Sequence, residues 1–214
     1  MTDDIRKILG ILRLAERLKS ELRHSWLSSG RRESVAEHTW QMALMAVLMH
    51  RHLEHKVDLE RTLAMITVHD LVEAIAGDVP FFETGERKAA KRARELAAIE
   101  EIHASLPPDT GDLVAGLWHE FEARTTAEAR FAVAIDNLEV QIQHNQADLS
   151  TWLPLEHGLV YTKMDGPCAH DAFLTAFCEA VKADAETKLR AGGFDPEAVK
   201  ARLGEPGSGP ALSA

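Results

Sequence analysis

The sequence is poor in cysteine, which excludes a disulfide framework and a cysteine-bound structural zinc site. Only Cys168 and Cys178 occur among the 214 residues; they lie ten positions apart, and neither has a CxxC partner. Isolated cysteines of this kind are typical of proteins kept in a reducing intracellular compartment. We therefore expect a cytoplasmic location.

Long apolar runs and an excess of basic residues are also absent. No stretch approaches the roughly 20 apolar residues of a membrane span, and the first residues, MTDDIRKILG, are too acidic for a secretory signal peptide. The formal net charge is -10, whereas proteins that bind nucleic acid polymers need a basic surface. We therefore expect neither a membrane nor a nucleic acid polymer as partner. A phosphorylated small molecule is compatible, because a metal ion and one or two arginines make a pocket locally positive.

Aromatic residues make up only 6% of the sequence, and alanine, leucine, glutamate and arginine dominate it. This composition favours an all-α fold. We predict helices over residues 3–19, 34–53, 58–76, 86–105, 110–122, 126–147 and 168–191, a short helix before residue 203, and no strand or hairpin. The sequence thus predicts one helical domain over 1–203 and a disordered Gly/Pro/Ser-rich tail at 204–214.

Several predicted helix ends carry their own signals. Ser34 opens a capping box, and Asp58 is a typical capping residue for the next helix. Thr125 or Thr126 marks a further start. Gly77 favours a helix end, because glycine readily adopts the left-handed conformation found there.

The stretch HDLVEAIAGD, residues 69–78, places four acidic or imidazole groups in an otherwise apolar helix. Buried groups of this kind cost free energy unless they are paired or bound to a metal ion. His69 and Asp70 point about 100° apart on a helix, so one ion between their directions can contact both. Glu73 shares their face, and Asp78 follows the helix on a loop.

Two similar anomalies occur on other predicted helices. His38 is a lone imidazole in ESVAEHTWQMALMAVLM, and Asp136 is a carboxylate in ARFAVAIDNLEVQIQ. With His69 and Asp70 they make a set of two imidazoles and two carboxylates. This set suits one divalent ion, Mn²⁺, Co²⁺, Fe²⁺, Mg²⁺ or Zn²⁺, with coordination positions left for water and substrate. A closed structural zinc site has a different, sulfur-rich set.

Each of these residues alone has a simpler interpretation. His38 alone is more typical of a hydrogen-bonded core histidine, Asp136 of a partner for a helix N-terminus, and Glu73 of an ion pair with a neighbouring helix. Their occurrence together favours the metal site. The histidines of HRHLEHK, residues 50–56, end a predicted helix, where imidazoles favour the C-terminal dipole. They therefore do not indicate a second metal site.

Three segments, ESVAEHTWQMA, HDLVEAIAGDVP and AEARFAVAIDNLEVQIQ, together resemble the HD-domain metal-dependent phosphohydrolases, and among these the HD-domain 5′-deoxynucleotidases. The resemblance covers residues 19–150. It implies an HD-type domain of about six to eight helices, with C-terminal helices at 168–203. It also implies a homodimeric, metal-dependent phosphomonoesterase that removes the 5′-phosphate from (deoxy)nucleoside monophosphates by means of metal-activated water.

The resemblance carries roles over to numbered positions. The metal ligands correspond to His38, His69, Asp70 and Asp136. The catalytic positions correspond to Asp78 and to Glu73, which orients or deprotonates the attacking water. The substrate-binding positions correspond to Arg23, Trp26, His38, Asp70, Asp78, Val79, Pro80, Phe81 and Asp136, of which Arg23 and Trp26 hold the phosphate.

One segment departs from the family pattern. Between Trp26 and His38, LSSGRRESVAE is shorter than in the family and lacks its Arg-Asn-Val segment, so Arg31 and Arg32 are candidates to replace it. The alternatives are an HD phosphohydrolase acting on a cyclic nucleotide, an alarmone or a nucleoside triphosphate, or a non-catalytic, metal-stabilised nucleotide-binding protein. Residues 151–170 are either a loop near the site or a connection between helices.

Overall fold

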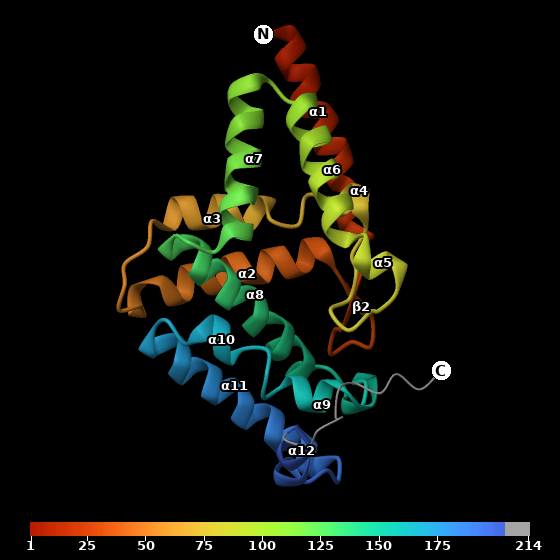
Figure 1. Ribbon diagram of the computed structural model, residues 1–214, viewed down its shortest axis with the longest axis vertical. Coiled ribbons are helices and arrows are strands. Elements are labelled where there is room, and N and C mark those ends of the chain that lie inside the picture. The colour runs from red at the N-terminus through yellow and green to blue at the C-terminus, as the bar shows by residue number, and fades with distance from the viewer. Residues whose placement is uncertain (204–214) are drawn as a thin grey trace.

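Helices dominate the chain (Figure 1), which confirms the all-α fold. The structure is a computed structural model that describes residues 1–203; the tail at 204–214, for which disorder is predicted, lies outside the described residues. The longer helices are α1 (Thr2–Ala15), α2 (Val35–Met49), α3 (Leu59–Val68), α6 (Lys91–Ser105), α7 (Pro108–Ala123), α8 (Ala127–Gln146), α11 (Ala172–Ala191) and α12 (Pro196–Leu203). Single-turn helices are α4 (Glu73–Ala76), α5 (Glu86–Ala89), α9 (Glu156–Leu159) and α10 (Asp165–Cys168), and 3₁₀ turns are η1 (Glu16–Lys19), η2 (His50–His52) and η3 (Leu149–Thr151).

Three predicted helix starts are confirmed by their caps. Ser34 forms the expected capping box at the start of α2. The Asp58 side chain accepts the backbone N–H of Arg61 at the start of α3. The Thr126 side chain accepts the backbone N–H of Ala129 at the start of α8. Each cap satisfies a backbone donor that has no partner inside its helix.

The prediction of no strand or hairpin was wrong. An antiparallel pair, β1 (Leu22–Trp26) and β2 (Arg32–Ser34), leads into α2. Gly30 in the turn has a φ of +82°, a conformation that glycine adopts at little cost. The Arg32 side chain also donates to the carbonyl of Arg23 at 2.8 Å. The strands are short and polar, so the alternation of apolar residues that signals a strand is missing. The turn and β2 lie in the segment that departs from the family pattern, and β1 directly precedes it.

The helix predicted over residues 58–76 is divided in two. Helix α3 ends at Val68, and α4 begins at Glu73. In the turn between them, the backbone N–H of Glu73 bonds to the carbonyl of Asp70, three residues back rather than four. In this tighter 3₁₀ geometry, side chains three positions apart lie one above the other. Asp70 and Glu73 therefore face the same side. Gly77, with a φ of +75°, ends α4 as predicted.

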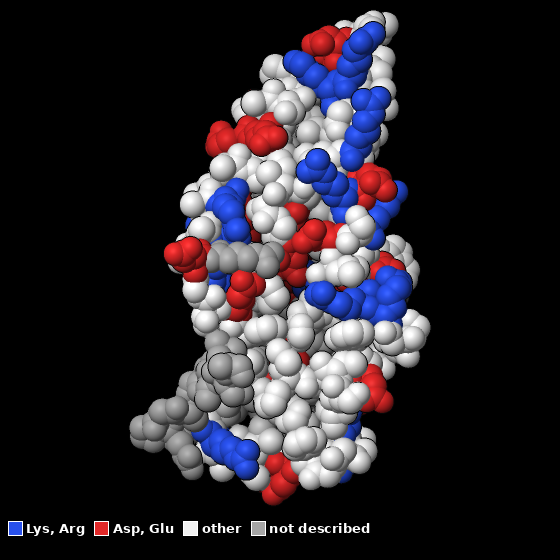
Figure 2. All heavy atoms as spheres, turned by 90° about the vertical axis from the view of Figure 1, so that its right-hand side faces the viewer, with Lys and Arg blue, Asp and Glu red and all other residues white. Residues whose placement is uncertain are grey.

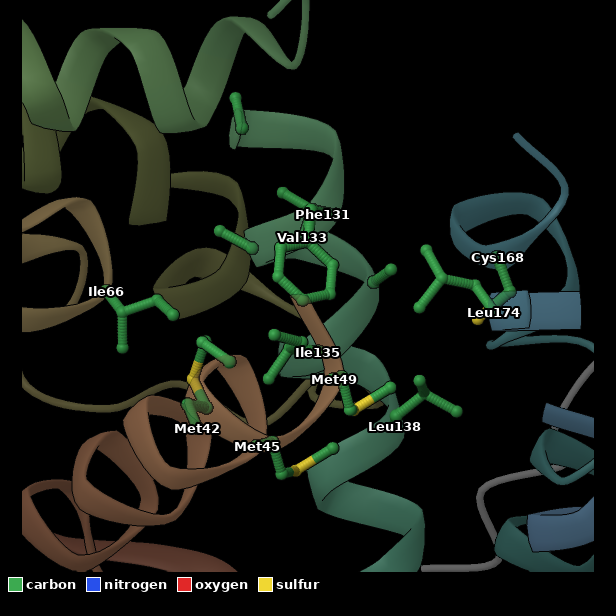
Figure 3. Packing of buried hydrophobic residues seen from close by; sticks show 14 of the residues in the cluster. Met42, Met45, Met49, Ile66, Phe131, Val133, Ile135, Leu138, Cys168 and Leu174 are labelled. Atoms are coloured by element: carbon green, nitrogen blue, oxygen red, sulfur yellow. The ribbon is translucent and has the colours of Figure 1, made fainter. Parts of the chain in front are cut away.

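Helix α8 forms the centre of the main core, and its apolar side chains meet those of α2, α3 and α11 (Figure 3). Phe131, Ile135 and Leu138 of α8 are fully buried. Met42 of α2 and Ile66 of α3 belong to the same core cluster, and both are 0% exposed. Side chains in such close-packed cores have little freedom to shift. The shared core therefore fixes α2, α3 and α8 relative to one another, together with the polar groups that they carry.

A second cluster holds α4 in place. Its buried members include Leu18 of η1, Ile99 and Ile102 of α6, and Trp118 of α7. Helices α6 and α7 form an antiparallel pair beside α1 (Figure 1). Because α4 packs against α6, this cluster positions the helix that carries Glu73.

Both cysteines are buried and free, so Cys168 and Cys178 are not joined by a disulfide. Within residues 1–203, no helix combines the length and the apolar character that crossing a membrane requires.

Candidate metal centre and active site

The four predicted metal ligands lie together where α2, α8 and the turn after α3 meet. His38 Nε2 lies 3.2 Å from Asp136 Oδ1 and 3.9 Å from Asp70 Oδ2. His69 Nε2 lies 3.1 Å from Asp70 Oδ2. The donor atoms of His38, His69 and Asp70 all lie within 4.8 Å of one another. The fold thus gathers donors from three separate segments at a spacing that one ion can bridge.

Both imidazoles turn Nε2 toward the cluster. His69 Nδ1 lies 2.7 Å from the carbonyl oxygen of Ile66, to which it donates. His38 Nδ1 lies 2.5 Å from Glu139 Oε2, and both of these residues are 0% exposed. With the proton on Nδ1, each Nε2 presents a lone pair, and both Nε2 atoms are buried without a hydrogen-bond partner. Lone pairs that face carboxylate oxygens repel unless a cation lies between them, so these residues fit a divalent ion.

The electrostatics of the cluster favour a cation. Burial and the charge of Arg23 lower the pKa of His38, but the carboxylates of Glu139 and Asp136 outweigh them and raise it to about 10. The same carboxylates that stabilise a proton on this imidazole stabilise a metal ion in its place.

Glu139 was not among the predicted site residues, although the sequence contains a signal for it. It lies three residues after Asp136 on α8, so the two share a helix face, and it interrupts an apolar run. A carboxylate that accepts the second N–H of a ligating histidine fixes the tautomer and the orientation of the ring.

Replacing Glu139 by glutamine is therefore expected to weaken metal binding by about 10- to 100-fold. The neutral amide holds the His38 ring less firmly and no longer makes Nε2 a stronger donor. Metal titration by calorimetry measures the change, with Glu60→Gln, at an exposed position on α3, as the control. An unchanged metal affinity in Glu139→Gln would contradict this role.

Glu73 and Asp78 lie beside the cluster. Glu73 is 4% exposed, and its Oε2 is buried without a hydrogen-bond partner. Burial, followed by repulsion from Asp70 and Asp78, raises the pKa of Glu73 well above its usual value. The backbone N–H of Asp78 donates to Glu21 Oε1 at 3.0 Å, which anchors the start of the loop. A buried carboxyl group with a raised pKa beside a metal site, such as that of Glu73, is suited to proton transfer.

Of the two side chains predicted to hold the phosphate, the structure brings Arg23 to the cluster but not Trp26. Arg23 Nη1 lies 3.4 Å from Asp70 Oδ2, and its Nε lies 3.7 Å from Glu33 Oε2. A cavity opens onto the cluster, and Trp26 does not line it. The Trp26 carbonyl accepts a hydrogen bond from Gln143 Nε2 at 2.7 Å.

Arg31 and Arg32 do not replace the missing family segment in the cavity. Arg31 forms an exposed pair with Glu37 at 2.6 Å. Arg32 donates to the carbonyls of Leu22 and Arg23, so it supports the hairpin. Neither arginine is part of the cavity wall.

A cavity of about 550 Å³ opens onto the cluster, a size typical of small-molecule sites. Val79, Pro80 and Phe81, which were predicted for the substrate side, form part of its wall. The cationic side chains in the wall are Arg23, Lys88, Lys91, Arg124 and Lys163. Lys163 Nζ also lies over the Phe81 ring. No local sequence pattern distinguishes Arg124 or Lys163 from surface cations, so their place in the site follows only from the fold.

The segment 151–170 lies at the site rather than forming only a connection. This segment, which includes the single-turn helices α9 and α10, contributes six residues to the wall: Glu156, Leu159, Thr162, Lys163, Met164 and Pro167. On the face shown in Figure 2, acidic and basic side chains crowd the middle of the molecule without forming a continuous basic surface.

Comparison with known proteins agrees with this arrangement. The sequence pattern of the HD domain matches residues 15–172. The human 5′-deoxynucleotidase HDDC2 is 28% identical over 193 residues, which cover 89% of this chain and 92% of the relative. The Xenopus laevis 5′-deoxynucleotidase HDDC2 is 32% identical over 140 residues, or 64% of this chain and 68% of the relative.

A solved structure shows the same relation in three dimensions. The crystal structure of a predicted metal-dependent phosphohydrolase from Magnetospirillum magnetotacticum MS-1 superimposes with a TM-score of 0.76 at 32% identity, covering 91% of this chain and 97% of that one. The HD pattern spans most of the described residues and includes the cluster of His38, His69, Asp70 and Asp136. The chain therefore belongs to the HD domain family of metal-dependent phosphohydrolases and is related to its 5′-deoxynucleotidases.

Proposed function

We propose that this protein is a metal-dependent 5′-deoxynucleotidase, which hydrolyses the 5′-phosphate ester of (deoxy)nucleoside monophosphates. The observation that carries the proposal is the pair of buried, unpartnered Nε2 atoms of His38 and His69, which face two carboxylates beside the buried carboxyl group of Glu73. The names of the relatives support the substrate class. The cavity volume of about 550 Å³ supports a small substrate.

His38, His69, Asp70 and Asp136 would hold one divalent ion, and Mn²⁺, Co²⁺, Fe²⁺, Mg²⁺ and Zn²⁺ all suit this donor set. When bound, such an ion lowers the pKa of a coordinated water and shields the charge of the phosphate.

The side chains of the protein complete the reaction. Glu73 accepts a proton from the water that attacks phosphorus, and the bond from phosphorus to the 5′ oxygen of the nucleoside breaks. The proton then passes from Glu73 to that oxygen, so the products are the nucleoside and inorganic phosphate and Glu73 is ionised again. Arg23 and Lys91, which line the cavity, bind the oxygens of the phosphate and stabilise the charge that builds up on them. Asp78 and the wall formed by Val79, Pro80 and Phe81 orient the nucleoside.

The experiment that tests this function is phosphate release from dAMP, dGMP, dCMP and TMP, each beside its ribonucleotide. The protein is stripped of metal and resupplied with Mn²⁺, Co²⁺, Mg²⁺ or Zn²⁺ in turn. We expect metal-dependent release from the deoxynucleoside monophosphates. Release confined to cyclic nucleotides, alarmones or nucleoside triphosphates would favour another HD phosphohydrolase, and tight nucleotide binding without release would favour a non-catalytic binding protein.

The proposal includes a cytoplasmic location and a single HD hydrolase domain over residues 1–203. The location is supported by two buried cysteines that remain free thiols. The domain is supported by α11, which packs on α8 and contributes Leu174 to the core that also holds the metal-binding helices (Figure 3).

A homodimer formed through α2 is also part of the proposal. Trp40, Leu44, Val47 and Leu48 recur at helical spacing on α2, and they are 64%, 42%, 47% and 63% exposed. An exposed apolar helix face of this kind is typical of an interaction surface. Two copies of one face can pack against each other about a two-fold axis, which is the commonest symmetry of protein oligomers.

Replacing Trp40 by glutamate is expected to weaken self-association by at least about 30-fold, since central tryptophans of interfaces contribute 2 kcal/mol or more. Analytical ultracentrifugation measures the change against the chain mass of 23.7 kDa. Leu113→Glu, at an exposed position on α7, is the control and should remain dimeric. A monomeric wild-type protein, or a Trp40→Glu variant that dimerises like the wild type, would contradict the α2 interface.

A further inference from the structure

A second polar cluster lines the same cavity away from the metal ligands, and the phosphohydrolase mechanism does not use it. Glu156, at the start of α9, is 4% exposed. Its Oε2 accepts the backbone N–H of Leu153 at 2.6 Å. Its Oε1 lies 3.4 Å from His24 Nε2 and 3.9 Å from His144 Nε2. All three ionisable side chains are in the cavity wall.

The position of this cluster follows from α8. Asp136, Val140 and His144 lie four residues apart on one face of the helix, and all three line the cavity. Eight residues of helix correspond to about 12 Å at 1.5 Å per residue. The cavity therefore has the metal ligands at one end and the Glu156 cluster about two helical turns away. A nucleotide that places its 5′-phosphate at the metal ligands extends its base in that direction.

The chemistry of the cluster is incomplete without a ligand. Burial raises the pKa of Glu156 to about 7, and no lysine or arginine of the described chain forms an ion pair with it. Burial lowers the pKa of His144 to about 4 and also lowers that of His24, so both imidazoles are neutral at pH 7. His24 Nε2 is buried without a hydrogen-bond partner. A buried carboxyl group without a counter-ion calls for hydrogen-bond donors.

The walls around the cluster suit a flat aromatic ligand. The His24 ring meets the Phe82 ring edge to face, with centroids 4.8 Å apart. Val140 and Leu159 add apolar surface to the wall. Proteins that bind a single nucleobase typically combine apolar or aromatic walls with hydrogen bonds to the polar edge of the base.

We propose that Glu156, together with His24 and His144, forms the subsite that binds the nucleobase and favours bases with an exocyclic amino group. Above pH 7 the ionised form of Glu156 predominates, and an ionised carboxylate only accepts hydrogen bonds. The amino groups of adenine, guanine and cytosine donate to it, and glutamate accepts such a bond from cytosine N4 in protein–DNA complexes. Thymine offers one ring N–H between two carbonyl oxygens, which repel the carboxylate. This inference rests on the proposed function and names the substrates preferred by that same site.

The test compares kcat/KM for dAMP, dGMP, dCMP, TMP and 2-deoxyribose 5-phosphate, which has no base. The wild-type protein should prefer the three amino-bearing nucleotides to TMP. Glu156→Gln should lose about 10- to 100-fold for those three, because hydrogen bonds to charged groups are strong. It should stay within about twofold of wild type for TMP and for the sugar phosphate, because its amide oxygen still accepts the N–H of Leu153.

His24→Phe is a second variant, which keeps a ring against Phe82. It should also reduce the ratio of kcat/KM for the three amino-bearing nucleotides to kcat/KM for TMP. Glu179→Gln, whose side chain is 64% exposed in the wild type, is the control. An equal loss in Glu156→Gln for every substrate, including the sugar phosphate, would assign Glu156 a merely structural role and overturn the subsite. Wild-type activity without base preference would also overturn it and leave the proposed function intact. No release from any deoxynucleotide would overturn both.

Discussion

Replacing Glu73 by glutamine is expected to lower kcat by about 10²- to 10⁴-fold, the usual contribution of a general base. The glutamine side chain has nearly the same shape but cannot accept the proton of the attacking water. Glu73 is not one of the four side chains that would hold the ion, so metal affinity and KM should change little. The apparent loss is therefore expected in the chemical step rather than in binding.

The Glu73→Gln protein should also be no less stable than the wild type. The buried Glu73 Oε2 has no hydrogen-bond partner, and repulsion from Asp70 and Asp78 adds to the cost of ionising this carboxyl group. The neutral glutamine side chain avoids that cost. Residues needed for activity often lower the stability of a protein, so replacing them often raises it. Steady-state kinetics measures kcat and KM, metal titration measures metal affinity, and thermal unfolding measures stability. The control is Glu101→Gln, at an exposed position on α6. A kcat within a few-fold of wild type would show that Glu73 is not the base.

Replacing His69 by phenylalanine is expected to remove metal binding and to lower kcat/KM by more than about 100-fold. Loss of a side chain that binds the ion directly should lower activity more than loss of a hydrogen-bond partner of such a side chain, which costs about 10- to 100-fold. The variant keeps a ring of similar size, which preserves the contact with Phe121, whose ring centroid lies 4.9 Å from that of His69. Without metal, its unfolding midpoint should stay close to that of the wild-type protein without metal.

The clearest measurement is the effect of metal on thermal stability. An ion present at 100 times its dissociation constant stabilises the wild-type protein by about 2.7 kcal/mol, and this increment should vanish in His69→Phe. The control is His55→Phe, because His55 with Glu54 and Asp171 forms another group whose donor atoms could hold an ion. Equal metal stabilisation in wild type and His69→Phe, or its loss in His55→Phe, would place the ion elsewhere.

The helices that carry the ligands could be predicted because their signals are local. Ser34, Asp58 and Thr126 mark the starts of α2, α3 and α8, and each does so through a bond to a backbone N–H within its own first turn. The polar residues His38 and Asp136 stand out because each lies beside an apolar run of its own helix, MALMAVLM after His38 and FAVAI before Asp136. A buried polar group needs a partner, so such an interruption indicates a site before any distance is known.

The hairpin, the turn after α3 and the place of Glu156 in the site could not be predicted, because no local sequence pattern indicates them. The hairpin of β1 and β2 is held by the arginine side chain of Arg32 and a glycine turn, not by alternating apolar residues. The turn at His69 and Asp70 lies in an apolar stretch that reads as continuous helix. Glu156 becomes a site residue only because α9 folds back against β1 and the end of α8, as its approach to His24 and His144 shows.

The position of the Trp26 side chain also depends on the fold. A sequence match assigns a position along the chain, whereas the direction of a side chain depends on the local backbone. Here Trp26 ends β1 next to a register irregularity, and its side chain does not reach the cavity wall. Arg23, three residues earlier on the same strand, reaches Asp70. A shift of register on a short strand decides which side chains face the site.

One divalent ion is expected to bind between α2, α8 and the turn after α3, with the phosphate beside it. Diffraction from crystals of the protein grown with Mn²⁺ and inorganic phosphate, collected for anomalous scattering of manganese, locates both. We expect one strong anomalous peak within coordination distance of His38, His69, Asp70 and Asp136. A peak at Glu54, His55 and Asp171, or at Asp165, Cys178 and Glu179, with none at the predicted ligands would contradict it.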